Sequence, residues 1–133
     1  MSASYVRSKT RTWAGEVSTT SAVPFYDTIN QAQNPTDDTW FTVSFTAEYA
    51  EGTFCDRGFM ELGFITITVV AAPGTGDTTA VDAMEKIIPE LMAKVDPSGR
   101  LVYESYEPLQ ENSLGSADRD YRLAVIINYR HSL

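Results

Sequence analysis

The sequence has very little of two residue types on which many reactive sites depend, because its 133 residues include one cysteine and one histidine. Cys55 cannot form a disulfide within the chain, and nothing in the sequence points to an oxidising compartment. A lone loop cysteine with no histidine nearby in sequence is usually inert. The histidine, His131, lies near the end of the chain and is expected to be a solvated side chain. The sequence therefore predicts no nucleophilic centre, and we expect no enzyme activity.

Long apolar runs are also missing. None approaches the ~20 residues needed to cross a bilayer, so we expect no membrane span. The first residues, MSASYVRSKTRTWAG, carry positive charge but no apolar stretch, so they do not have the pattern of a secretory signal. The expected site of synthesis is therefore intracellular.

Spacings that hold metals or phosphates are scarce as well. The segment APGTGDTT lacks the lysine of a phosphate-binding loop and the three glycines of a dinucleotide-binding turn, so we expect no cofactor. Clustered carboxylate oxygens suit Mg²⁺ or Ca²⁺, so a weak contact with such an ion stays open. The carboxylate pairs lie in or beside polar loops, where acids are normally solvated: Asp37 with Asp38, Glu48 with Glu51, and Asp118 with Asp120.

Basic residues are outnumbered by acidic ones, 10 to 18, which gives a net charge of −8 and argues against general binding of nucleic-acid phosphates. The basic residues Arg7, Lys9 and Arg11 nevertheless stand together, with no acid before Glu16. They are either a solvated helix face or a basic end that docks on the acidic body of an identical neighbour. The acids expected at such a subunit contact are Asp37, Asp38, Glu48, Glu51, Glu107 and Glu111.

The first third of the chain is predicted to form a helix followed by a strand. Ser2 or Ser4 can cap a helix that fades by the serine and threonine cluster at 18–21. Ala22–Tyr26 is predicted to be a short extended segment, and 27–38 a polar loop. Trp40–Thr46 alternates as a half-buried strand does, with Phe41, Val43 and Phe45 on one face.

The rest of the sequence predicts three more long strands and a second helix. The strands are expected at Phe59–Ala71, Arg100–Tyr106 and about Asp120–Arg130, with polar loops at Glu48–Gly58 and Glu107–Arg119. The helix begins at Asp77 or Thr78, and its apolar stripe is traced to Val95. Pro89 lies inside that pattern, so a kink or a break into two helices is expected there.

This order of elements predicts a single α+β domain. Only one connection between long strands carries a helix of crossover length. The simplest assembly is therefore a mainly antiparallel, twisted sheet of four to five strands with two helices packed on one face.

Several segments resemble the tail terminator, or tail completion, proteins of long-tailed bacteriophages, including the lambda minor tail protein U-like group. The resemblance covers nearly the whole chain in order and spacing. It rests on VPFYDTINQAQNP, TWFTVSF, CDRGFMELGFITITVVAAPGTGD, the helix that follows, and YRLAVIINYRHSL.

The resemblance implies a structural assembly protein of the virion tail, made in the bacterial host cytoplasm. Such proteins form a ring, typically of six subunits, on the head-proximal end of the finished tail tube. The ring stops tube polymerisation and offers a surface to the head–tail connector. The implied partners are other copies of the chain, the tail-tube protein and the connector, with DNA only as passing cargo.

Two alternatives from other classes remain. One is a neighbouring structural component, either a head–tail connector or a tail-tube subunit. The other is a small α+β-roll enzyme or ligand-binding domain, which needs a deep pocket with convergent polar groups.

Overall fold

The computed structural model describes residues 4–27, 38–52, 59–72, 76–108 and 121–132. Six elements follow one another along the chain. They are helix α1 (Ser4–Ser21), strands β1 (Thr39–Gly52) and β2 (Phe59–Ala71), helix α2 (Gly76–Met92), and strands β3 (Leu101–Pro108) and β4 (Tyr121–Ser132).

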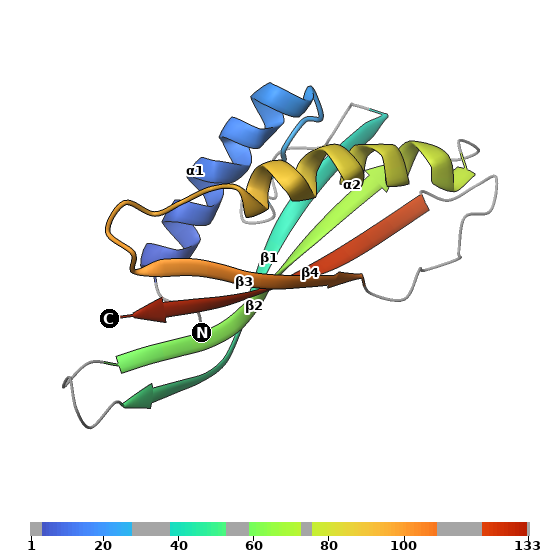
Figure 1. Cartoon of the computed structure of the whole chain (residues 1–133). Coiled ribbons are helices and arrows are strands. Elements are labelled where there is room, and N and C mark those ends of the chain that lie inside the picture. The colour runs from blue at the N-terminus through green and yellow to red at the C-terminus, as the bar shows by residue number, and fades with distance from the viewer. Residues whose placement is uncertain (1–3, 28–37, 53–58, 73–75, 109–120, 133) are drawn as a thin grey trace.

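The strands form one antiparallel sheet in the order β1-β2-β4-β3, and both helices lie against the same face of it. Figure 1 also shows the twist of the sheet. The connection from β2 through α2 to β3 passes over β4, so β2 and β3 run in the same direction with β4 between them. This arrangement confirms the predicted α+β class, the antiparallel sheet and the two helices on one face.

Alternating side chains explain why these segments are strands. Successive residues of β4 are alternately buried and more exposed, and Phe41 and Val43 of β1 are buried while Thr42 and Ser44 are not. A period of two places every second side chain on the helix-covered face. The predicted inward face of β1 is therefore confirmed.

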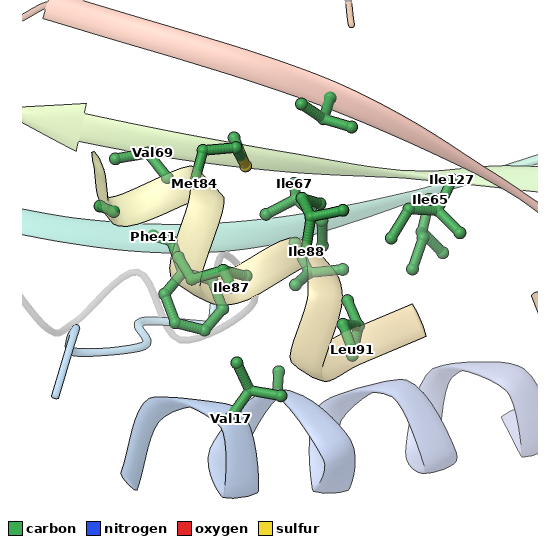
Figure 2. Packing of buried hydrophobic residues seen from close by; sticks show 14 of the residues in the cluster. Val17, Phe41, Ile65, Ile67, Val69, Met84, Ile87, Ile88, Leu91 and Ile127 are labelled. Atoms are coloured by element: carbon green, nitrogen blue, oxygen red, sulfur yellow. The ribbon is translucent and has the colours of Figure 1, made fainter. Parts of the chain in front are cut away.

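The hydrophobic core lies between the sheet and the helices. Isoleucine side chains of α2 pack against those of β2 and β4, and Val17 of α1 belongs to the same core (Figure 2). Full burial of each such side chain contributes ~1.5–3 kcal/mol, so this layer is the main source of stability. Its fully buried large members include Phe41, Ile65, Ile67, Ile87, Leu91, Ile127 and Tyr129.

Helix α1 extends to Ser21, the last residue of the serine and threonine cluster by which it was expected to fade. Thr19 and Thr20 donate hydrogen bonds to the carbonyls of Gly15 and Glu16, four residues earlier. Their hydroxyls therefore bond within the helix and do not draw the backbone out of it. Ala22 then adopts φ 61°, a left-handed conformation that commonly ends helices. The predicted extended segment at Ala22–Tyr26 is reduced to an isolated parallel bridge between Phe25 and Phe41.

The predicted break of the second helix into two helices at Pro89 and the predicted loop from Glu48 are both wrong. Helix α2 continues through Pro89 to Met92 as one helix, because proline removes one backbone bond while Ile87, Ile88 and Leu91 hold the helix on the core. Strand β1 runs to Gly52, across an irregularity between Ala47 and Tyr49, where a loop from Glu48 was expected.

Val95 does not belong to the apolar stripe of α2. The helix ends at Met92, and Val95 lies beyond it, 80% exposed. The residues of the predicted loops at 28–37, 53–58 and 109–120 lie outside the described part of the chain.

Candidate interaction surfaces

The basic residues of α1 are partly engaged within the molecule. The guanidinium groups of Arg7 and Arg11 lie 5.0 and 5.3 Å from the ring centre of Phe45, and Arg11 also pairs with Asp27 at 2.8 Å. Lys9 lies 5.7 Å from the ring centre of Trp13 on the same helix. All three basic side chains are half-buried. Each stacked cation contributes ~0.5–1 kcal/mol at such sites, so the cluster joins α1 to β1 as well as facing outwards.

The two acidic residues predicted as contacts whose side chains the structure describes do not lie in one patch. Asp38 is exposed beside the start of β1, and Glu107 is exposed on β3, which is the opposite edge of the sheet. The amide of Asn128 donates to Glu107 at 3.4 Å. Glu48 and Glu51 lie on β1, but their side chains are outside the described part of the structure, as are residues Asp37 and Glu111.

A buried carboxylate organises the turn between α2 and β3. Asp96 is 5% exposed and accepts hydrogen bonds from the hydroxyl of Tyr5 at 2.7 Å, the backbone N–H of Leu101 at 3.1 Å, and both the N–H and the hydroxyl of Ser98. Burial alone would raise the pKa of Asp96, but these bonds lower it to about 2. The ionised carboxylate therefore ties α1 to the start of β3.

A second buried polar group lies beside the first. The hydroxyl of Tyr129 donates to Glu61 at 2.6 Å, and His131 Nδ1 lies 3.7 Å from the other oxygen of Glu61. The ring of His131 stacks on Tyr5 with 5.3 Å between ring centres. Burial lowers the pKa of His131, which the nearby Glu61 opposes and Arg100 reinforces. Neutral imidazole is the form that this environment favours.

The expectation that His131 is solvated is wrong, because its side chain is 0% exposed. Strand β4 continues to Ser132, and His131 takes the next inward position after Tyr129. The alternation from Tyr121 to Tyr129 was the signal that could have placed it. Its two ring nitrogens have no hydrogen-bond partner among the described residues.

These polar groups are positioned to join elements rather than to meet a substrate. His131, Glu61 and Asp96 are all at most 5% exposed, so each is covered by the elements that it joins. Nothing in the sequence pattern singled out Glu61 or Asp96, because a strand acid and a turn aspartate are usually solvated.

An apolar groove opens between α2 and the edge of the sheet formed by β3 and β4. Its volume is about 190 Å³, and Tyr106, which forms one wall, is 57% exposed. Pocket-bound small molecules usually occupy ~300–1,000 Å³, so this groove fits an apolar side chain better than a metabolite. The residues that line it are Met84, Glu85, Ile88, Pro89, Tyr106 and Val125.

A second hollow lies between the C-terminal end of α1 and the same stretch of α2. It has a volume of about 420 Å³ and a mainly polar lining. Thr20 and Ser21 contribute from α1, and Glu85, Lys86, Pro89 and Glu90 from α2. Glu85, Lys86 and Glu90 are exposed, as expected for solvated charges at a helix surface.

The sheet face opposite the helices is left uncovered by the described elements (Figure 1). It carries half-buried apolar side chains among threonines and charged groups, including an Arg130–Glu104 pair at 3.5 Å. The apolar members are Trp40, Met60, Leu62, Phe64, Val102, Ala124 and Ile126. Such a face is available to another protein layer.

Comparisons with known proteins assign no family: no protein-family model matches the chain, and no curated protein matches it either. Within the described ranges, no group of three or more histidine, cysteine, aspartate or glutamate side chains is arranged to hold a metal ion. The described helices include none that is long and apolar enough to traverse a membrane.

Proposed function

We propose that this chain is a ring-forming subunit that caps the head-proximal end of a phage tail tube, stops its growth and presents a surface for head joining. The observation that supports this most is the one-sided fold. Both helices cover one face of the sheet, and half-buried apolar side chains remain on the other. A sheet with one uncovered face suits a protein in which neighbouring subunits cover that face. The sequence resemblance to tail terminators supplies the kind of neighbour.

A closed ring needs two different surfaces on each subunit, because head-to-tail contacts close only by rotation. The chain has an uneven charge that suits such a contact, with a basic cluster on α1 and exposed acids on α2 and β3. Complementary charge orients two approaching subunits more than it raises the affinity between them. Salt should therefore slow assembly more than it loosens the finished ring.

Tube-length control is the direct test of the proposed function. Purified protein is added at low ratio to polymerising tail-tube subunits encoded in the same genome, and tube lengths are measured by electron microscopy. Tubes should become shorter and end in a cap as the ratio rises. Incorporation along the tube would instead identify a tube subunit, and unchanged lengths would contradict the proposal.

The basic cluster is tested by a matched pair of charge-reversal variants. Arg7→Glu with Lys9→Glu should weaken self-association at low salt and lower the free energy of unfolding by no more than about 1–2 kcal/mol, the contribution of two stacked cations, while Arg11 stays paired with Asp27. The control is Lys86→Glu with Arg122→Glu, which makes the same charge change at exposed positions elsewhere. Equal sedimentation behaviour of the two variants would remove α1 from the contact.

A further inference from the structure

The one histidine of the chain is enclosed at one end of the fold. The side chain of His131 is 0% exposed, and neither of its ring nitrogens has a hydrogen-bond partner among the described residues. Its backbone lies in β4, between β2 and β3, where it pairs with Glu61 on one side and with Leu101 on the other. Because the sheet holds the backbone on both sides, water reaches the imidazole only if the residue that covers it moves.

The first turn of α1 provides that cover. The ring of Tyr5 stacks on the imidazole of His131, with 5.3 Å between ring centres and 12° between ring planes. The hydroxyl of Tyr5 donates to Asp96 at 2.7 Å, and the guanidinium of Arg100 lies 4.7 Å from the ring centre of Tyr5. Figure 1 shows the start of α1 beside the end of β4 and the beginning of β3. Tyr5 therefore attaches the start of α1 to both of these strand ends.

The start of α1 is also the part of the helix that opens most easily. Terminal turns of helices open at low free-energy cost. The first turn contains no acidic residue and carries Arg7, and positive charge near a helix N-terminus is unfavourable. The next turn is anchored, because Val6 is 0% exposed and the hydroxyls of Thr10 and Tyr103 are hydrogen-bonded at 2.6 Å in the interior. An opening of this end would therefore move the first two described residues of α1 and stop at Val6.

The groups around His131 disfavour its charged form while α1 covers it. Five titratable or charged groups lie around the imidazole: Tyr5 of α1, Glu61 of β2, Tyr129 of β4, and Asp96 and Arg100 of the turn before β3.

Burial and the positive charge of Arg100 lower the pKa of His131, and Glu61 and Asp96 oppose them without reversing the shift. The nearer oxygen of Glu61 is 3.7 Å from Nδ1, which is too long for a hydrogen bond, and its other oxygen accepts from Tyr129 at 2.6 Å. A proton added to the covered imidazole therefore creates a buried cation without a hydrogen-bonded partner among these groups, which is strongly destabilising.

We propose that Tyr5 and His131 form a pH-sensitive latch, in which protonation of His131 releases Ser4 and Tyr5 so that the imidazolium reaches water while the rest of the fold stays in place. The stack on His131 and the hydrogen bond to Asp96 are lost together, because both depend on the position of Tyr5. This inference is independent of the proposed function, since it concerns a contact within one subunit.

Hydrogen exchange of single amides, followed by NMR, tests the latch. In helix α1 the N–H groups of Ser8 and Lys9 donate to the carbonyls of Ser4 and Tyr5, whereas that of Thr10 donates to the buried Val6. Exchange rates at pH 7 and pH 5 are divided by the intrinsic rates at each pH, which gives the opening constant of each amide. The proton binds the open form preferentially, where His131 has its ordinary pKa of 6.5. The opening constants of Ser8 and Lys9 should therefore rise roughly 10- to 25-fold between pH 7 and pH 5, and that of Thr10 by less than about twofold.

His131→Phe is the matched control, because it keeps an aromatic ring against Tyr5 and binds no proton. In this variant the opening constants of Ser8 and Lys9 should be equal at the two pH values. Asp96 does not disturb the comparison, because its pKa of about 2 lies well below the range.

Two results would overturn the latch. One is a pH effect on Ser8 and Lys9 of the same size in wild type and His131→Phe, including no effect in either. The other is an equal rise at Thr10, which would show that acid unfolds the whole helix and not its first turn. The comparison of Lys9 with Thr10 needs only the wild-type protein, so it decides between local and general opening even if the variant does not fold.

Discussion

Asp96→Asn is the substitution for which the structure gives the sharpest expectation. The two carboxylate oxygens accept four hydrogen bonds: Oδ2 accepts from Tyr5 and from the buried N–H of Leu101, and Oδ1 accepts twice from Ser98. An amide group can replace only one of these oxygens. Its NH₂ should turn towards Ser98, whose hydroxyl can rotate to accept, so that Leu101 keeps its partner.

The variant therefore loses the backbone bond from Ser98 and the charge that strengthens the others. Hydrogen bonds to charged groups contribute ~1.5–3 kcal/mol each, so we expect a loss of roughly 2–3 kcal/mol in the free energy of unfolding. For a chain of this size that corresponds to a fall of roughly 6–15 °C in melting temperature. Urea unfolding followed by tryptophan fluorescence at pH 7 measures it, since Trp13 packs against Tyr103 in the core.

The pH dependence gives a second, independent check. Because the pKa of Asp96 is about 2 when folded and 3.8 ordinarily, its stabilisation is present above pH 3.8 and is lost as the pH falls towards 2. The difference between wild type and Asp96→Asn should therefore narrow below about pH 4. Asp82→Asn, at an exposed position on α2, should change stability by less than about 0.5 kcal/mol. Equal stability of Asp96→Asn and wild type at pH 7 would refute the reasoning.

Two further predictions concern β4. His131→Phe keeps the stack on Tyr5 but removes a group whose pKa is lowered on folding. Below about pH 6.5, the free energy of unfolding of the wild type should therefore fall more steeply than that of the variant, which urea titrations from pH 7 to 5 measure. Parallel curves of unfolding free energy against pH would exclude His131 as the cause of the pH dependence. Val125→Asp with Ile127→Asp should abolish cooperative melting, because it buries two unpaired carboxylates in the core, whereas Arg122→Asp at an exposed position of the same strand should melt normally. A normal melting curve for the double variant would contradict the placement of β4.

Much of the fold was predictable because its strands follow a clear period of two. The inward series of β4, from Tyr121 to Tyr129, and that of β1 both appear as predicted, and β2 has the predicted bounds. Where prediction failed, tertiary packing overrode a local preference. Pro89 disfavours a continuous helix, yet Ile88 and Leu91 on either side are buried and hold α2 together.

The buried polar cluster could not be predicted in the same way. Tyr5, Glu61 and Asp96 come from α1, β2 and the turn after α2, so no local spacing brings them together. The candidate interaction surfaces were only partly foreseen for the same reason. The basic residues of α1 are recognisable as a run, but their stacking on Phe45 depends on how α1 crosses β1.

The polar cluster explains why one end of this small domain can present a fixed surface. Buried polar groups add little net stability compared with apolar packing, but each demands a particular partner in a particular direction. Tyr5 meets that demand twice, by donating to Asp96 and by stacking on His131, so α1, β4 and the turn before β3 are held in one relative orientation. An apolar core alone would permit the turn to shift with small changes in packing.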